Sequence, residues 1–395
     1  MTTTLSSGER AIPQSVVVVA LGTTQTLAWA SSYYLPAILA DDMAVATGVS
    51  RSWVFAVFSA SLLLAAALGP AVGRRIDQRG GSGVLVASNV LLAVGLVGLS
   101  LCGGIVSLAT AWTVLGVGMS LGLYDAAFAT LAGIYGRQAR IPITGITLIA
   151  GFASTVGWPL SALLDASVGW RGTCATWAAM HLVIGLPLNL LLVPRHSDKH
   201  PDDTQHGQAR WQPRKEMILL AYVFAASWFV TGAMAAHLPV LLERMGATTV
   251  QAVAAAALIG PAQVAARLAE FLVMRRSHPL VSARLATLMH PIGAAAIAAL
   301  GTPVAALFGL LHGAGNGLLT IARGTVPLAL FGPDGYGART GLLGAPARAA
   351  QAAAPLLFGL LLDANGPKVL LVSSGLSLSA FAALLLLKRT SASEL

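Results

Sequence analysis

Charged side chains lie inside long apolar runs of the sequence, among them Asp125, Arg267, Arg323 and Arg348. An ionised group in a hydrocarbon environment is costly unless a partner compensates its charge. The guanidinium group of arginine stays protonated and matches a carboxylate through two parallel hydrogen bonds. These residues therefore predict ion pairs inside the protein, capture of a carboxylate ligand, or both.

Arg267 and Arg348 are the candidates for binding a ligand. No acidic residue occurs between Asp334 and Asp363, so Arg348 has no acidic partner within its own run. Arg267 has Glu270 three residues further on, which lies on nearly the same face of a helix. Arg267 can therefore bind a substrate carboxylate, pair with Glu270, or extend toward the nearby membrane surface.

Asp125 is the only acidic residue deep in an apolar run of the first half of the sequence. It can carry a proton or hold an ion pair. Counting from the repeated glycines Gly116 and Gly313, Asp125 corresponds to the residue next to Arg323. The sequence therefore predicts that Asp125 and Arg323 meet across the molecule as a gate, with Arg348 as a competing partner.

Aromatic and polar side chains in the same kind of run can line a cavity. Trp29 and Tyr33 stand one helical turn apart, Tyr34 follows, and His237 takes the place of Tyr34 in the second half of the sequence. Packing inside a bundle, or a belt of aromatic residues at the membrane interface, explains the same pattern. These four residues are candidates for contact with a ligand.

The composition indicates the medium in which these runs lie. Of the 395 residues, 56% are hydrophobic and 10% are charged, and the mean hydropathy is +0.76. Soluble domains carry about 25% charged residues. A soluble enzyme and a disordered chain are therefore excluded, and an all-α membrane protein is predicted. The net charge of +9 fits basic cytoplasmic loops better than nucleic-acid binding.

Charged residues, glycines and prolines divide the apolar runs into twelve predicted transmembrane helices. The predicted spans are 16–39, 52–72, 84–101, 107–134, 142–164, 173–193, 217–242, 250–273, 283–300, 304–331, 341–362 and 369–387. Lys and Arg collect in alternate loops, which predicts a multi-pass protein of the cell membrane with both termini cytoplasmic. The predicted organisation is a tail at 1–15, a six-helix bundle at 16–194, a linker at 195–216, a second bundle at 217–387 and a tail at 388–395.

The two predicted bundles carry matching motifs in the same order. The matches pair Leu35-Pro36 with Leu238-Pro239, Gly69-Pro70-Ala71 with Gly260-Pro261-Ala262, Gly116-Val117-Gly118 with Gly313-Ala314-Gly315, and Thr144-Gly145 with Thr340-Gly341. Each pair is separated by about half of the chain, which indicates duplication of a six-helix unit. Two parallel six-helix halves with a site near the membrane midplane are a transporter architecture.

The duplicated pattern resembles the major facilitator superfamily. After the second predicted helix, Gly73, Asp77 and Gly80 match the loop motif of that superfamily, although Ser82 and Gly83 stand where its last basic residues usually are. The resemblance implies two pseudo-symmetric six-helix bundles, with this loop as a cytoplasmic latch between conformations.

The eighth predicted helix resembles that of the monocarboxylate transporters. In that branch an arginine seven residues after a glycine, here Arg267 after Gly260, binds the substrate carboxylate, and Gln263 stands where an aspartate often carries a proton. Arg348 is similar to a cation in the eleventh helix of oxalate–formate exchangers, and Tyr124 lies in a similar glycine-rich fourth helix. The resemblance implies that these side chains contribute to a carboxylate site.

These observations predict a secondary transporter of a small mono- or dicarboxylate that works by alternating access, coupled to protons or to exchange. Asp125, Arg323 and Glu270 are the candidates for proton coupling or a gate. The alternatives are a multidrug or metabolite exporter on the same fold and a sensor that no longer transports. The sequence contains no P-loop or His-Glu-x-x-His motif, so we expect no enzymatic activity, cofactor or metal. We expect a monomer in the lipid bilayer whose partner is a small organic anion.

Overall fold

The computed structural model describes residues 12–194 and 215–387, and all regular secondary structure in these two ranges is helical. Residues 1–11, 195–214 and 388–395, which hold most of the predicted tails and linker, lie outside the described residues. Eight segments are long and apolar enough to cross a membrane, and two of them, Ile105–Leu192 and Tyr336–Leu386, turn back within their length. With the first two helices, these segments make the twelve passes predicted from the sequence.

The first half of the chain makes six passes. Its helices are α1 (Gln14–Ser31), α2 (Pro36–Thr47), α3 (Arg51–Arg79), α4 (Ser82–Ser100), α5 (Ile105–Gly122), α6 (Tyr124–Tyr135), α7 (Arg140–Ala150), α8 (Ala153–Met180) and α9 (Leu186–Leu192). The chain reverses inside α8 at Gly169, whose φ of 71° is a left-handed conformation that favours glycine. A π-helical turn, His181–Gly185, joins α8 to α9.

The second half repeats this arrangement. Its helices are α10 (Lys215–Arg244), α11 (Thr249–Ala257), α12 (Ile259–Leu272), α13 (Pro279–Leu300), α14 (Ala305–Phe331), α15 (Tyr336–Asn365) and α16 (Val369–Leu386). α11 and α12 form one pass, and every other helix of this half is a pass by itself.

Short sequence signals explain where several helices begin and end. The hydroxyl of Ser50 accepts a hydrogen bond from the backbone N–H of Trp53 and caps the start of α3. Thr248 and Gln251 form a capping box at the start of α11. α2 begins at Pro36, whose missing N–H costs nothing in the first turn.

Four passes that the sequence predicted as single helices are interrupted. The spans predicted at 142–164 and 250–273 are divided between α7 and α8 and between α11 and α12. The span predicted at 16–39 is divided between α1 and α2, with Tyr33 and Tyr34 in the break. The span predicted at 107–134 is divided at Leu123, whose φ of −81° and ψ of −177° are extended. Apolar composition defines the length of a span but does not detect a local break, so the pattern missed all four.

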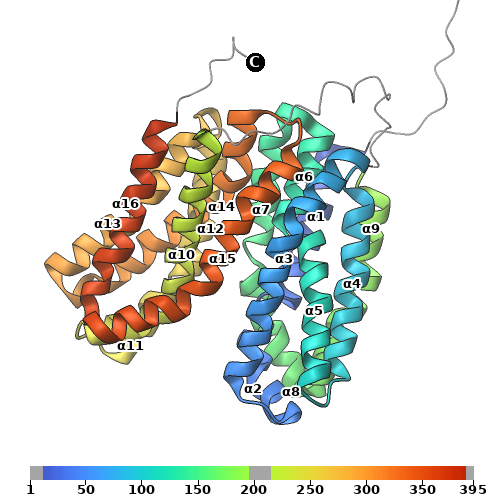
Figure 1. Cartoon of the computed structure of the whole chain (residues 1–395), viewed down its shortest axis with the longest axis horizontal. Helices are drawn as coiled ribbons and strands as arrows, with labels where there is room; N and C mark the ends of the chain where they lie inside the picture. The colour runs from blue at the N-terminus through green and yellow to red at the C-terminus, as the bar shows by residue number, and fades with distance from the viewer. Residues whose placement is uncertain (1–11, 195–214, 388–395) are drawn as a thin grey trace, which may run out of the picture.

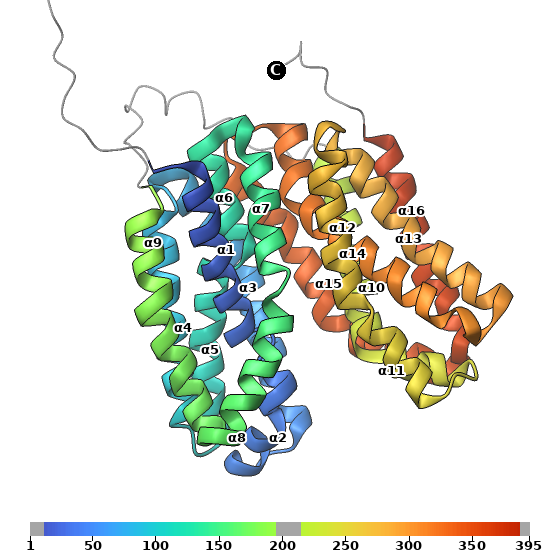
Figure 2. The same ribbon diagram turned by 180° about the vertical axis from the view of Figure 1, so that it is seen from behind.

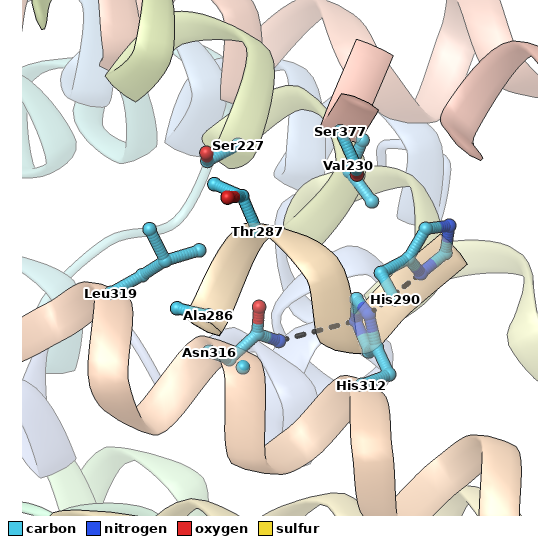
Figure 3. A pocket seen from close by; sticks show the side chains of 10 residues that line it. Ser227, Val230, Ala286, Thr287, His290, His312, Asn316, Leu319 and Ser377 are labelled. Carbon is cyan, nitrogen blue, oxygen red and sulfur yellow. Dashed lines mark hydrogen bonds between the residues drawn. The ribbon is translucent and has the colours of Figure 1, made fainter. Parts of the chain in front are cut away.

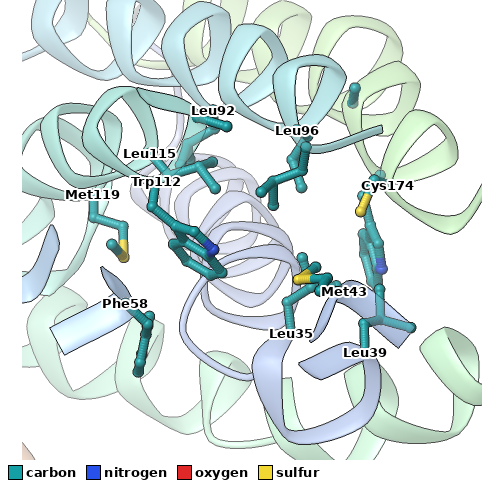
Figure 4. Close-up of a cluster of buried hydrophobic side chains, with 14 of the residues drawn as sticks. Leu35, Leu39, Met43, Phe58, Leu92, Leu96, Trp112, Leu115, Met119 and Cys174 are labelled. Carbon is teal, nitrogen blue, oxygen red and sulfur yellow. The ribbon is translucent and has the colours of Figure 1, made fainter. Parts of the chain in front are cut away.

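The first half is held by a core of large apolar side chains between α2, α3, α4 and α5 (Figure 4). Trp112 is fully buried and contacts the edge of Phe58, with ring centroids 5.2 Å apart. Leu35, Leu39 and other aliphatic residues surround these rings. This packing gives the helices that carry site residues a common apolar core.

The two halves lie side by side and meet mainly at one end (Figures 1 and 2). We call this end the terminal face, because α1 and α10 begin there and α16 ends there. Toward the opposite face the two groups of helices diverge. The contacts between the halves join α3, α6 and α7 to α12, α14 and α15.

The closest approach between the halves is a crossing of α3 and α15 at glycines, which we call the glycine crossing. It is formed by Gly69 and Gly73 on α3 and by Gly337 and Gly341 on α15. A Cβ atom on Gly73 would lie 1.9 Å from the carbonyl oxygen of Gly337, and one on Gly341 would lie 2.4 Å from that of Gly69. Small residues four positions apart allow such backbone contact in membranes.

We predict that Gly73→Ala separates α3 from α15. The helices must move apart by about 1–2 Å to bring the added methyl group to van der Waals distance. The measurement is the distance between spin labels on the exposed residues Gln78 and Asp334. Gly375→Ala, where nothing lies within 4 Å of the added Cβ, is the matched control. An unchanged label distance in Gly73→Ala would contradict the prediction.

Candidate functional site

A cluster of three charged side chains joins the halves near the middle of the molecule. Oδ2 of Asp125 accepts a hydrogen bond from Nη2 of Arg323 at 2.6 Å and another from Nη2 of Arg348. Arg348 also donates to the carbonyl oxygen of Ala65 at 3.1 Å. The aspartate comes from the first half and both arginines from the second, so the cluster exists only while the halves are together at this level.

Local structure places Asp125 in this cluster. The break at Leu123 starts a new helix, and Asp125 lies in the first turn of α6, where the helix dipole stabilises a negative charge. The carbonyl oxygen of Gly122, freed by the break, accepts a hydrogen bond from the side chain of Gln25. Gly344 leaves the space that the carboxylate and the guanidinium of Arg323 occupy, because a Cβ atom there would lie about 3 Å from both.

Arg267 is buried between the halves without an acidic partner in the described residues. It is 5% exposed, and its hydrogen bonds go to the carbonyl oxygen of Thr147 (3.3 Å), Oε1 of Gln263 (3.2 Å) and Oγ1 of Thr320 (3.3 Å). Its Nε atom is buried and has no hydrogen-bond partner. The site therefore holds a cation whose charge is met only by neutral groups.

Two glycines give Arg267 its position. Its guanidinium lies against Gly151, where an added Cβ would be 2.5 Å from Nη1. α12 approaches α14 closely at Gly317, where an added Cβ would be 2.4 Å from the carbonyl oxygen of Gln263. Both contacts hold the arginine on the boundary between α7 and α14.

Glu270 does not pair with Arg267, although the sequence left that pairing open. Its carboxylate lies 3.1 Å from Nη2 of Arg140 on α7, in the other half. Arg140 also donates to the carbonyl oxygens of Ser277 (2.6 Å) and Met274 (3.1 Å). Glu270 is only 1% exposed, so this ion pair closes the contact between α7 and α12 nearer to the terminal face.

An aromatic wall in the first half is built on the two helix breaks. The ring of Trp29 lies 5.2 Å from that of Tyr33, 6.1 Å from Tyr34 and 5.1 Å from Tyr124, measured between centroids. Tyr34 and Tyr124 lie within the range of electrostatic interaction with the guanidinium of Arg267. The indole N–H of Trp29 is buried without a partner. The wall therefore offers apolar faces and a spare donor close to an unbalanced cation.

Two further contacts involve candidate residues of this region. The hydroxyl of Tyr33 accepts a hydrogen bond from Nε2 of Gln351 on α15 at 3.0 Å, which links the aromatic wall to the second half. His237 lies elsewhere, with Nε2 2.7 Å from the carbonyl oxygen of Pro355 and its ring stacked on Phe358. The contacts of His237 are therefore with α15 of its own half.

The loop motif of the sequence also lies on the boundary between the halves. The carboxylate of Asp77 accepts hydrogen bonds from the backbone N–H groups of Gly337 and Ala338, both at 2.8 Å, and so caps the start of α15. Gly73 belongs to the glycine crossing one turn earlier, and Gly80 ends α3 with a φ of 78°.

Sequence reasoning missed several residues of this region. Arg140 had the character of a loop residue, while Thr147, Thr320 and Gln351 are ordinary polar residues in apolar runs. Small cavities lie beside Glu270 and, inside the second half, around His290 and His312 (Figure 3). The described residues hold no group of three or more His, Cys, Asp or Glu that could bind a metal ion.

Comparison with known proteins agrees with this architecture. Among solved structures, the chain is similar to the human organic anion transporter MFSD10 (TETRAN), with a TM-score of 0.72, 19% identity, and coverage of 94% of this chain and 98% of that one. It is also similar to the proton:xylose symporter XylE bound to 6-bromo-6-deoxy-D-glucose, with a TM-score of 0.73, 14% identity, and coverage of 94% and 95%. At these identities the likeness shows the fold alone.

No curated protein sequence matches the chain. A family model described as Major Facilitator Superfamily matches residues 21–311, which is more than half of the chain. The protein therefore belongs to the Major Facilitator Superfamily of membrane transporters.

Proposed function

We propose that this transporter moves a small organic anion, a mono- or dicarboxylate, by alternating access between its two halves. The observation that carries the proposal is the environment of Arg267, which is buried between the halves and hydrogen-bonded only to neutral acceptors. An uncompensated buried charge is destabilising. A carboxylate would supply the missing negative charge in the two-pronged geometry that a guanidinium prefers.

The wider balance of charge supports the same conclusion. Away from the terminal face, the described region between the halves holds three arginines, Arg267, Arg323 and Arg348, and one carboxylate. That carboxylate, of Asp125, pairs with Arg323 and Arg348 and leaves Arg267 without a counter-charge. Fixed charges of one sign in a site with low-dielectric walls attract ligands of the opposite sign. A neutral, hydroxyl-rich ligand would leave this surplus of positive charge in place.

The aromatic wall can bind the part of a small carboxylate that lies beyond its carboxylate group. Trp29, Tyr34 and Tyr124 offer ring faces for an apolar carbon skeleton, and the free indole N–H of Trp29 can donate to a second polar group. Gln263 already orients the guanidinium of Arg267 from one helical turn earlier. The two similar structures are titled an organic anion transporter and a proton:sugar symporter, so the fold itself carries ligands of either type.

We place the terminal face in the cytoplasm, as the distribution of Lys and Arg predicts. The Asp125 cluster, the Arg140–Glu270 ion pair and the cap of Asp77 on α15 would then hold the cytoplasmic side closed. Opening that side would break all three. Arg348 would then separate from Asp125 and become available to a substrate carboxylate. The arginine can therefore exchange the carboxylate of Asp125 for that of the substrate when the cytoplasmic side opens.

We predict that Arg267→Gln lowers the affinity for small carboxylates by about 10–100-fold. This is the range expected for losing a charge-assisted hydrogen bond of about 1.5–3 kcal/mol. Arg267→Lys keeps the charge without the fork and should recover part of the affinity. The measurement is the thermal shift of purified protein with lactate, oxalate and other carboxylates, followed by uptake into proteoliposomes.

Arg51→Gln is the control, because Arg51 forms an exposed ion pair with Asp41. The same panel includes xylose and lipophilic cations. Stabilisation by lipophilic cations instead of carboxylates would favour an exporter, and anion binding without uptake would favour a sensor. Unchanged carboxylate affinity in Arg267→Gln would refute the assignment of this residue.

A second prediction concerns the Asp125 cluster. Asp125→Asn leaves two buried arginines without a counter-ion in the closed state, a loss of about 3–5 kcal/mol for a broken buried pair. The variant should therefore shift the population toward conformations that are open at the terminal face. Distances between spin labels on Gln78 and Asp334 report this opening. Asp41→Asn removes the carboxylate of an exposed pair and should leave the distances as they are in the parent protein.

A further inference from the structure

A pair of histidines lies buried inside the second half, apart from the boundary with the first half. His290 on α13 and His312 on α14 are 4% and 2% exposed, and their Nδ1 atoms are 3.1 Å apart (Figure 3). A cavity of about 20 Å³ adjoins them, which is enough for one ordered water molecule. The two titratable rings can bind a proton, and a water molecule in the cavity can deliver it.

The hydrogen bonds around the pair fix the donors and acceptors when both rings are neutral. The Ser373 hydroxyl donates to the carbonyl oxygen of Leu370 and so accepts from Nε2–H of His290 at 3.0 Å. Nδ1 of His290 then accepts from Nδ1–H of His312. Nε2 of His312 in turn accepts from the amide of Asn316 at 3.2 Å. Every ring nitrogen has one partner of the right kind.

The same network accepts one additional proton after a single rotation. If the side-chain amide of Asn316 turns over, its Oδ1 atom accepts a hydrogen bond from Nε2–H of His312, and its Nδ2 atom donates one to the hydroxyl of Thr231. The hydroxyl of Thr231 can give up its own hydrogen bond to Asn316, because it can donate instead to the backbone carbonyl oxygen of Ser227, which lies 3.0 Å away. Nδ1–H of His290 then donates to His312, and every polar group remains paired. A second added proton would place two like charges in contact.

No charged group of the described chain faces the pair. The polar side chains that face it from α10, α13, α14 and α16 are Ser227, Thr231, Thr287, Asn316, Ser373 and Ser377, none of which is charged. A proton on the pair therefore has no fixed counter-charge. Its charge can be offset by an anion that binds nearby.

One turn of α14 connects the pair to the anion site. Oγ1 of Thr320 accepts a hydrogen bond from Nη2 of Arg267 and donates one to the backbone carbonyl oxygen of Asn316 at 2.9 Å. Asn316 is also the residue whose side-chain amide must turn over when the histidine pair is protonated. An anion at Arg267 and a proton on the histidines attract each other, so each increases the affinity for the other.

We infer that His290 and His312 together bind the proton that this transporter carries with its anion. The inference rests on the proposed function and makes the protein a proton–anion symporter. Asp125 is unsuited to this task, because both guanidinium groups of its cluster bind its carboxylate and would lose their counter-ion if it took up a proton.

The test measures the affinity for lactate and oxalate between about pH 5 and pH 8, where histidines titrate. If one proton binds with each anion, the affinity of the parent protein falls about tenfold per pH unit on the alkaline side. His290→Asn and His312→Asn should bind the probes with an affinity that does not depend on pH. They should keep anion counterflow in proteoliposomes and lose accumulation driven by a pH gradient.

His181→Asn is the matched control. His181 is also fully buried, and its ring nitrogens bind Ser31 (2.7 Å) and Asn89 (3.0 Å), with no second histidine of the described residues in contact. This variant should keep the pH dependence. Asn316→Asp covers the case in which the histidine variants fail to fold. It places a carboxylate beside His312, so the decline in affinity should begin at a higher pH.

The outcomes separate the inference from the proposed function. Two results would overturn the inference and leave the function standing. One is anion binding that still depends on pH in both histidine variants, and the other is an Asn316→Asp variant whose affinity begins to fall at the same pH as that of the parent protein. Failure of every carboxylate to bind the parent protein would overturn the function. In that case histidine ring NMR of the anion-free protein decides: the two rings must titrate together as one proton, and independent titration would overturn the proton site.

Discussion

The structure depends on the sharing of one buried carboxylate by two arginines from the opposite half. Asp125 alone, or either arginine alone, would be an uncompensated charge in a medium of low dielectric constant. The contact therefore stabilises the closed state at the terminal face and sets a large penalty for separating the halves at this depth. Opening requires a replacement for each lost partner, which water or a carboxylate ligand can supply. The same constraint applies to Arg267, which has no acidic partner in the described structure even when the halves are closed.

The site residues of the first half lie at helix breaks, and those of the second half lie within helices, away from such breaks. The break between α1 and α2 holds Tyr33 and Tyr34, and the break at Leu123 places Tyr124 and Asp125 at a helix start. Irregular backbone inside a membrane must be paired within the protein. Here Gln25 bonds the carbonyl oxygen freed at Gly122. The second half instead presents Arg267, Arg323 and Arg348 from regular helices, whose positions are set by close glycine contacts.

The sequence predicted the all-α membrane fold and the twelve passes, because apolar run length follows directly from bilayer thickness. The internal repeat placed Asp125 beside Arg323, and the two form an ion pair. Duplicated halves put equivalent residues at equal depth, which is why the repeat pointed to this pair, and the role of the pair as a gate stays a prediction. The partner of Glu270 was not predictable, because Arg140 is far away in the sequence and belongs to another half. The His290–His312 contact escaped notice because the residues lie on different helices whose rotation no pattern defines.

The glycine crossing has a thermodynamic consequence for the exchange between conformations. Because α3 and α15 touch through backbone at Gly69, Gly73, Gly337 and Gly341, their separation exposes mainly peptide groups and little apolar side-chain area. Burial of apolar area is the source of both hydrophobic stabilisation and the heat-capacity change. Wetting this surface therefore costs little hydrophobic free energy and changes the heat capacity only slightly. The enthalpy of opening at the crossing should consequently stay nearly constant with temperature, and the charged contacts should decide which conformation is populated.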